Sequence, residues 1–180
     1  MKVERTSIAD VLVIEPKVFG DARGFFMETW NARTFESLGI RAQFVQDNHS
    51  RSARNVLRGL HYQLRQPQGK LVRVTAGEIW DVAVDMRRSS PDFGRWTGIK
   101  LDAAARRMLW IPAGFAHGFV VLSEHAEVQY KTTDFYAPEQ ERTLLWNDPA
   151  LAIAWPHQGA PLLSEKDRRG TPLAQAETFD

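Results

Sequence analysis

Short runs rich in β-branched and aromatic residues recur along the whole chain, with turn-forming residues between them. Runs of this kind cover residues 11–14, 25–30, 43–46, 70–75, 79–84, 98–101, 108–111, 119–122 and 128–133. Glycine, proline, asparagine and aspartate separate them, for example at 67–69 and 90–92. Because these residues favour turns, each run is predicted to be a strand. Many short strands with few helices predict an all-β sandwich or barrel.

Two short helices are predicted among the strands, at residues 32–38 and 165–169. Each is preceded by a residue that can cap a helix and followed by a glycine that can end it. These flanking residues are Asn31 and Gly39 for the first helix, and Ser164 and Gly170 for the second. The sequence from 144 to 180 is rich in proline, asparagine and aspartate. We expect it to wrap the barrel rather than form a second domain.

The composition is that of one ordinary globular domain. The chain has 180 residues, of which 43% are hydrophobic and 25% are charged, which suits a single domain with a sizeable core. A net charge of +1 gives no reason to expect nucleic acid or a membrane surface as a partner. The absence of cysteine excludes disulfides, thiolate metal sites and a cysteine nucleophile. The pairs Arg87-Arg88 and Arg106-Arg107 are interpreted as solvated turn residues.

The distribution of apolar residues predicts a cytoplasmic protein. Charged residues are scattered through positions 1–10, which is unlike the apolar core of a secretory signal. No apolar run approaches the roughly 20 residues that a membrane-spanning helix needs.

One predicted barrel strand, at residues 57–63, carries polar side chains where an apolar interior would be expected. It contains Arg58 and His61, and Lys70 follows at the start of the next strand. Such breaks of the local pattern concentrate at functional sites. The strand is therefore the first candidate for a site.

Strand geometry raises a problem for this candidate. Strict alternation puts His61 and Gln63 on one face and Arg58 on the other. If Arg58 and His61 contact one ligand, Gly59 marks a bulge or kink. Otherwise Arg58 meets the ligand at the rim of the barrel.

The segment Pro112-Ala-Gly-Phe-Ala-His117 resembles the second sequence signature of the cupin superfamily, whose fold is a double-stranded β-helix of jelly-roll type. In metal-binding cupins the first signature supplies His-x-His and a downstream glutamate. The matching positions here are His61, Gln63 and Lys70, so an amide and a cation replace a histidine and a carboxylate. Lys70 would repel a metal ion, and two histidines alone rarely hold one. We therefore expect a cupin barrel without a metal.

A histidine and a lysine in a metal-free barrel are suited to enolate chemistry. A neutral His61 imidazole can take a proton from a carbon next to a carbonyl group, and the Lys70 ammonium can stabilise the resulting oxyanion. Inversion of a stereocentre also needs a proton donor on the opposite face, for which Tyr130 is a candidate. A carboxylate should orient the imidazole and raise its basicity. Asp167 and Asp81 are both available for that role.

Seven motifs, spread over nearly the whole chain, fit one pattern. They are Gly20-Asp-Ala-Arg-Gly24, Gln46-Asp-Asn48, Leu57-Arg-Gly-Leu-His-Tyr-Gln63, Gly69-Lys-Leu-Val-Arg-Val74, residues 110–118, Trp146-Asn-Asp-Pro149 and Leu163-Ser-Glu-Lys-Asp167. Together they resemble the dTDP-4-dehydrorhamnose 3,5-epimerase family of dTDP-L-rhamnose synthesis. The resemblance implies a dTDP-linked 4-keto-6-deoxyhexose as substrate. It further implies that dTDP-4-dehydro-6-deoxy-D-glucose is inverted at C3 and C5 to dTDP-4-dehydro-L-rhamnose through an enolate.

The resemblance also implies roles for individual residues. It makes His61 the general base, with Asp167 as its carboxylate partner. Tyr130 is then the proton donor on the opposite face, and Lys70 stabilises the enolate oxygen. Tyr136 is placed where an aromatic ring stacks on the thymine. Other substrate contacts are implied for Arg23, Glu28, Gln46, Asp47, Asn48, Arg58, His117, Glu141 and Lys166. No metal and no cofactor are implied, and the family pattern implies a homodimer with partly shared active sites.

Other interpretations stay open from the sequence alone. The same scaffold could invert only C3 or only C5, or move the carbonyl as a ketoisomerase. A non-catalytic barrel that binds nucleotide sugars would not need an acid and a base. A metal-dependent cupin would contain stoichiometric Fe, Mn or Zn. The destination of the sugar, a rhamnose glycan such as an O antigen or an antibiotic, is also left open.

Overall fold

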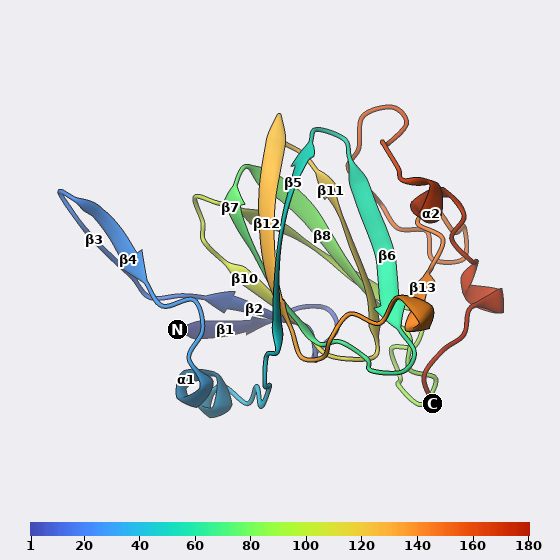
Figure 1. Cartoon of the computed structure of the whole chain (residues 1–180), viewed down its shortest axis with the longest axis horizontal. Helices are drawn as coiled ribbons and strands as arrows, with labels where there is room; N and C mark the ends of the chain where they lie inside the picture. The colour runs from blue at the N-terminus through green and yellow to red at the C-terminus, as the bar shows by residue number, and fades with distance from the viewer.

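The computed structural model describes residues 1–180 and contains two antiparallel sheets that face each other (Figure 1). The six-stranded sheet has the order β1 (Lys2–Arg5), β2 (Leu12–Glu15), β10 (Met108–Ile111), β7 (Lys70–Ala76), β12 (His125–Thr132) and β5 (Gln46–Ala53). The five-stranded sheet has the order β13 (Glu141–Thr143), β6 (Leu57–Gln63), β11 (Phe115–Val121), β8 (Glu78–Asp85) and β9 (Trp96–Asp102). The predicted all-β barrel is confirmed.

The side chains that point into the barrel form its main core. Val72 and Val128 from the six-stranded sheet meet Ile79 and Phe119 from the five-stranded sheet in one buried cluster. Side chains two residues apart in a strand share a face. The inward row of β7 therefore includes Lys70 as well as Val72, and the core continues directly into polar residues.

The outer face of the five-stranded sheet is also buried. Val82 and Val84 of β8 pack there against C-terminal residues that include Leu144 and Trp155. Figure 1 shows this C-terminal stretch, coloured orange to red, beside β6 and β13. The five-stranded sheet is therefore covered on its inner face by the barrel core and on its outer face by the C-terminal residues, which explains why every residue of β11 is buried.

Both predicted helices are confirmed, and each ends one residue earlier than predicted. In α1 (Ala32–Ser37), the Asn31 side chain accepts hydrogen bonds from two backbone N–H groups of the first turn. In α2 (Glu165–Arg168), the Ser164 hydroxyl accepts one from the backbone of Asp167. Two single 3₁₀ turns, η1 (Pro138–Gln140) and η2 (Leu173–Gln175), complete the helical structure. The chain has no helix long and apolar enough to cross a membrane.

The strand predicted at residues 43–46 is wrong. β5 begins only at Gln46 and runs through polar residues to Ala53. Its inward side chains, such as Asn48 and Ser50, line a cavity rather than an apolar core. The strand therefore lacks the apolar alternation on which such a prediction depends. The exposed strand β1 is absent from the prediction for the same reason.

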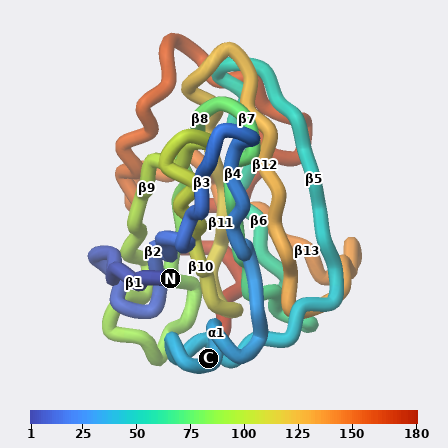
Figure 2. The backbone as a smooth tube through the Cα atoms, turned by 90° about the vertical axis from the view of Figure 1, so that its left-hand side faces the viewer, coloured from blue at the N-terminus to red at the C-terminus, as the bar shows by residue number.

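A hairpin of β3 (Val18–Asp21) and β4 (Gly24–Met27) projects away from the barrel (Figure 1), and Figure 2 views the molecule from the side of this hairpin. It pairs with no other strand. Phe19, Phe25 and Phe26 on this hairpin are exposed. The Arg106 guanidinium lies 4.1 Å from the centre of the Phe25 ring. The rest of the hairpin presents an apolar surface that its own chain leaves uncovered.

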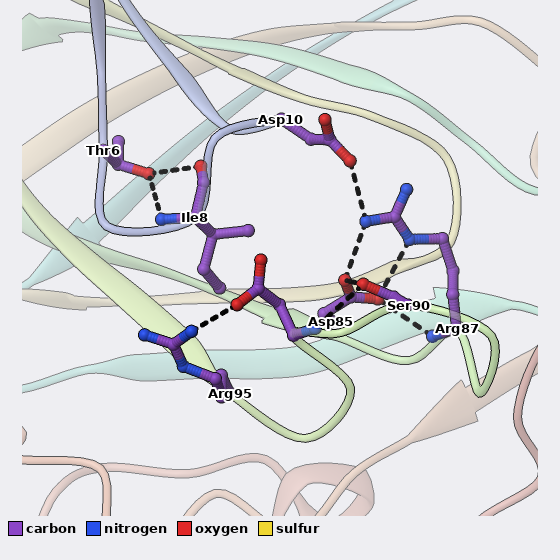
Figure 3. A network of polar contacts seen from close by, with 8 residues as sticks. Thr6, Ile8, Asp10, Asp85, Arg87, Ser90 and Arg95 are labelled. Carbon is purple, nitrogen blue, oxygen red and sulfur yellow. Dashed lines mark hydrogen bonds and ion pairs between the residues drawn. The ribbon is translucent and has the colours of Figure 1, made fainter.

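Arg87 is not the solvated turn residue that the sequence predicts, because it lies in a network of polar contacts (Figure 3). Its guanidinium donates to Asp85 at 3.0 and 2.7 Å and to Asp10 at 2.9 Å. The buried Asp85 carboxylate also accepts a hydrogen bond from Ser90 at 2.6 Å. Burial opposes ionisation of Asp85, but the hydrogen bonds from Arg87 and Ser90 outweigh it and hold its pKa below the ordinary value. The network joins the end of β8 to the loop before β2.

Candidate active site

A cavity of about 800 Å³ is lined by side chains from both sheets and from the C-terminal stretch. Most of the residues that the sequence singles out meet in this cavity. They are Gln46, Asn48, Arg58, His61, Lys70, His117, Tyr130, Tyr136, Glu141, Lys166 and Asp167.

His61 and Asp167 form a hydrogen-bonded pair, although 106 positions separate them in the sequence. Nε2 of His61, on β6, lies 2.6 Å from Oδ1 of Asp167, on α2. The second oxygen of the Asp167 carboxylate accepts a hydrogen bond from the Ser164 hydroxyl at 2.7 Å. An ionised carboxylate only accepts hydrogen bonds, so Nε2 carries a proton. In a neutral ring, Nδ1 then keeps its lone pair and is free to act as a base.

The surroundings keep this pair in the protonation state of a general base. Burial lowers the pKa of His61, and the hydrogen bond with Asp167 opposes this shift only in part. Burial alone would raise the pKa of Asp167, but its hydrogen bonds with His61 and Ser164 outweigh that effect and lower it. At neutral pH, a neutral imidazole therefore stands beside a carboxylate.

Asp81, the other carboxylate considered for His61, belongs to a second histidine. Nε2 of His117 lies 2.9 Å from both oxygens of Asp81, and both side chains are buried. His117 and His61 are direct partners in the ladder between β11 and β6. The structure thus pairs Asp167, and not Asp81, with His61.

Lys70 brings a positive charge to the cavity from the start of β7. Its side chain is buried, and Nζ donates a hydrogen bond to the backbone oxygen of His61 at 3.2 Å. Burial lowers the pKa of Lys70 to about 8, although the nearby Asp81 carboxylate opposes the shift. The ammonium is therefore mostly charged at neutral pH, and it has two further hydrogens to offer a ligand.

Tyr130 reaches the cavity from the opposite sheet. It lies on β12 of the six-stranded sheet, whereas His61 lies on β6 of the five-stranded sheet. Burial raises the pKa of Tyr130, so its phenol stays protonated at neutral pH. A base and a potential acid therefore enter one cavity from facing sheets.

A bulge at Gly59 brings Arg58 and His61 to the same cavity. The ladder pairs Arg58 with Phe119 and His61 with His117, so β6 has one residue more than β11 between these pairs. Gly59 has a φ of 128°, and a Cβ atom there would lie 2.5 Å from the backbone of β11. Only glycine fits this position. The predicted bulge is confirmed.

The sequence profile of the dTDP-4-dehydrorhamnose 3,5-epimerases matches residues 5–175 of the chain. The chain belongs to this family. It is 66% identical over 180 residues to the dTDP-4-dehydrorhamnose 3,5-epimerase of Pseudomonas aeruginosa, with 99% of both chains covered. The identity to that of Shigella flexneri is 58% over 181 residues, again with 99% of both chains covered.

A solved structure of similar shape is the dTDP-6-deoxy-D-glucose-3,5-epimerase from Legionella pneumophila Philadelphia 1, in complex with dTDP-4-keto-L-rhamnose. The TM-score is 0.95 at 51% sequence identity, and the match covers 98% of this chain and 94% of that chain. The epimerase fold therefore extends over almost the entire molecule.

At the mouth of the epimerase cavity, two side chains converge on Glu141. The Tyr136 hydroxyl donates a hydrogen bond to Oε2 of Glu141 at 3.1 Å, and Nζ of Lys166 donates to the same oxygen at 2.9 Å. Tyr136 is 53% exposed, so its ring is open to solvent and to a ligand. Its stacking on a base stays a prediction.

Three residues that the family resemblance assigns to the substrate lie outside the cavity of their own chain. Asp47 is on the outer face of β5, because alternation turns Gln46 and Asn48 inward, and its carboxylate binds Lys131 at 2.8 Å. Its contact with the substrate stays a prediction. Arg23 and Glu28 lie on and just after the projecting hairpin, and Glu28 accepts a hydrogen bond from Asn31. Their contact with a ligand of a partner subunit stays a prediction.

The cavity is also lined by polar residues that have no role in the site predicted from the sequence. Gln68 and Ser164 line it, and so does Gln63, which stands where metal-binding cupins have a histidine. The contact of Ser164 could have been predicted from the sequence. Its spacing from Asp167, Ser-x-x-Asp, is that of a helix cap, and the same spacing lets the Ser164 hydroxyl donate to the Asp167 carboxylate. No group of three or more histidine, aspartate or glutamate side chains is arranged to hold a metal ion.

Proposed function

We propose that the protein inverts C3 and C5 of dTDP-4-dehydro-6-deoxy-D-glucose and so forms dTDP-4-dehydro-L-rhamnose. The observation that carries the proposal is the pairing of a base and an acid across one cavity. The His61–Asp167 pair lies on one side and Tyr130 on the other, with the Lys70 ammonium next to His61. Binding alone would not need this arrangement, whereas inversion of a carbon next to a ketone does.

The reaction begins at a hydrogen made acidic by the C4 ketone. Nδ1 of His61 takes the proton, the electron pair of the C–H bond enters an enolate, and negative charge develops on the C4 oxygen. The buried Lys70 ammonium stabilises that charge. Tyr130 then donates its proton to the same carbon from the opposite face, which inverts it. The phenolate regains a proton from solvent, the imidazolium loses one, and the cycle repeats at the second carbon.

The nucleotide part of the substrate holds the sugar in position. The Arg58 guanidinium suits a phosphate group, and its Nε donates to the Ser52 hydroxyl at 2.9 Å, which fixes its direction. Tyr136 offers an aromatic ring at the mouth. Binding energy from the nucleotide then lowers the entropic cost of bringing the reacting carbon between the base and the acid.

We also propose a homodimer in which the hairpin of one chain completes the cavity of the other. The side chain of Arg23 is 90% exposed, and the nearby Phe26 is exposed as well. Both features are explained if this surface meets a second copy. Light scattering should give the mass of two chains, and the mass of a single chain at assay concentration would contradict the dimer.

Deuterium incorporation tests the reaction directly. Incubation with dTDP-4-keto-6-deoxyglucose in D₂O should label the sugar at both C3 and C5, because each inversion replaces a carbon-bound hydrogen by one from solvent. Mass spectrometry and proton NMR count and locate the labels, with an enzyme-free sample as the control. A label at one position would identify a single-site epimerase, and no exchange at neutral pH would overturn the proposal.

The pH dependence of kcat/KM should be bell-shaped and report the free enzyme's base and cation. His61 must be neutral, and burial lowers its pKa, so the acid limb should lie below the ordinary histidine value of about 6.5. Lys70 must be charged, so activity should fall as the pH rises through about 8, the pKa of its ammonium. Steady-state rates at fixed ionic strength measure both limbs. A rate that stays flat well above that pH would show that a charged Lys70 is not needed.

A further inference from the structure

The segment that carries Tyr136, residues 134–137, has no place in either sheet. It follows β12 and precedes η1, so no strand ladder sets its position. Most of its backbone hydrogen bonds are made instead with the side chains of three glutamines, all of which line the cavity. We call these residues, Gln46, Gln63 and Gln68, the glutamine cradle.

Gln63 forms hydrogen bonds with the segment through both the nitrogen and the oxygen of its side-chain amide. Nε2 donates to the backbone oxygen of Phe135 at 3.1 Å and to that of Gln66 at 2.8 Å. Oε1 accepts a hydrogen bond from the backbone nitrogen of Ala137 at 3.0 Å. The backbone groups on both sides of Tyr136 are therefore fixed by one side chain, which is only 4% exposed.

The other two glutamines hold the neighbouring residues. Nε2 of Gln68 donates to the backbone oxygen of Asp134 at 2.9 Å, and Oε1 of Gln46 accepts from the backbone nitrogen of Tyr136 at 3.0 Å. The cradle thus contacts four consecutive residues from β5, β6 and the loop before β7. An amide suits this task because it both donates and accepts, which neither a carboxylate nor an ammonium can do.

We propose that Gln63 and Gln68 are positioning residues that set the affinity for the nucleoside of the substrate by holding Tyr136 at the mouth. Both hydrogens of the Gln63 amide are used by the protein, so it acts through Tyr136 rather than by donating to the ligand. At the position where metal-binding cupins have a histidine, this chain uses Gln63 to shape its binding site. The inference rests on the proposed function, because it takes the base of dTDP as the partner of Tyr136.

Methionine replaces glutamine with a side chain of similar length that cannot make these hydrogen bonds. In Gln63→Met, the Kd for dTDP and the KM for the sugar nucleotide should rise roughly tenfold, while kcat changes less than about twofold, because the groups around the sugar are untouched. Gln68→Met should show the same split with a smaller rise. Gln175→Met is the matched control, because Gln175 is exposed on the C-terminal stretch, and it should bind dTDP like the parent protein. Calorimetry and steady-state kinetics give these values.

A double-mutant cycle with Tyr136 separates positioning from other effects. If Gln63 acts through Tyr136, Gln63→Met should weaken dTDP binding little further in a Tyr136→Ala background. Two results would overturn the inference, provided that the parent protein binds dTDP. One is an additive loss of dTDP affinity in the double variant, and the other is an unchanged Kd in Gln63→Met. If Gln63→Met does not fold, the same cycle is measured with Gln68→Met and Tyr136→Ala. A parent protein that fails to bind dTDP would instead contradict the proposed function.

Discussion

Replacement of His61 by glutamine should lower kcat by about 10²–10⁴-fold, the usual contribution of a general base. The amide nitrogen of glutamine can take the place of Nε2 and still donate a hydrogen bond to Asp167, so the pair loses its basic nitrogen without leaving the buried carboxylate unpaired. Deuterium exchange into the sugar should fall with kcat, because proton removal is the step that we propose for His61. Both are measured with purified protein, and its melting temperature should stay close to that of the parent.

The control for this change is His125→Gln, a histidine at the start of β12 that does not line the cavity. It should retain full activity. Asp167→Asn should also be slow, and the double variant with His61→Gln should be little worse than the single one, because residues that act as a unit are not additive. Retention of exchange in His61→Gln would remove His61 as the base.

Replacement of Arg87 by alanine should lower the free energy of unfolding by about 3–5 kcal/mol, as expected when one partner of a buried ion pair is removed. Asp85 would keep only neutral donors, the Ser90 hydroxyl and the backbone N–H of residue 87, in a place where its side chain has no exposure. For a chain of this size the melting temperature should then fall by roughly 6–20 °C. Urea unfolding and thermal melts followed by circular dichroism measure the loss.

Arg88→Ala is the neighbouring control. Arg88 is exposed and donates a hydrogen bond to the Thr178 hydroxyl, so its loss should cost about 1 kcal/mol or less. Equal stability of the two variants would show that the Arg87 network does not stabilise the fold. The double variant Arg87→Ala with Asp85→Asn should recover part of the loss, because it removes the unpaired charge.

Much of the fold follows from the sequence because most strands bury one or both faces. Runs such as β10 coincide with the predicted strand at 108–111, and both helix caps are where the sequence places them. The failures share a physical cause. β5 lines a cavity with one face and leaves the other largely polar, so no pattern of apolar residues marks it.

The site could be predicted only in part, because several contacts depend on tertiary structure. Local sequence cannot choose between Asp81 and Asp167 as the partner of His61, since the choice depends on where α2 packs against β6. Local sequence also cannot predict the full set of contacts of Arg87, because Asp10 belongs to a loop that is distant in the sequence. Gly59 is a different case, because the conflict between Arg58 and His61 in a regular strand leaves two solutions, a bulge at this glycine or a contact of Arg58 at the rim. The structure has the bulge.

The separation of His61 and Asp167 by 106 positions has a consequence for biosynthesis. Both sheets are complete in the emerging polypeptide once Thr143 has been made, yet the carboxylate arrives more than 20 residues later. A nascent or proteolytically shortened chain that stops in between has the strands of a barrel but no partner for its imidazole. The orientation of the His61 ring thus depends on a residue that is made after every strand of the two sheets.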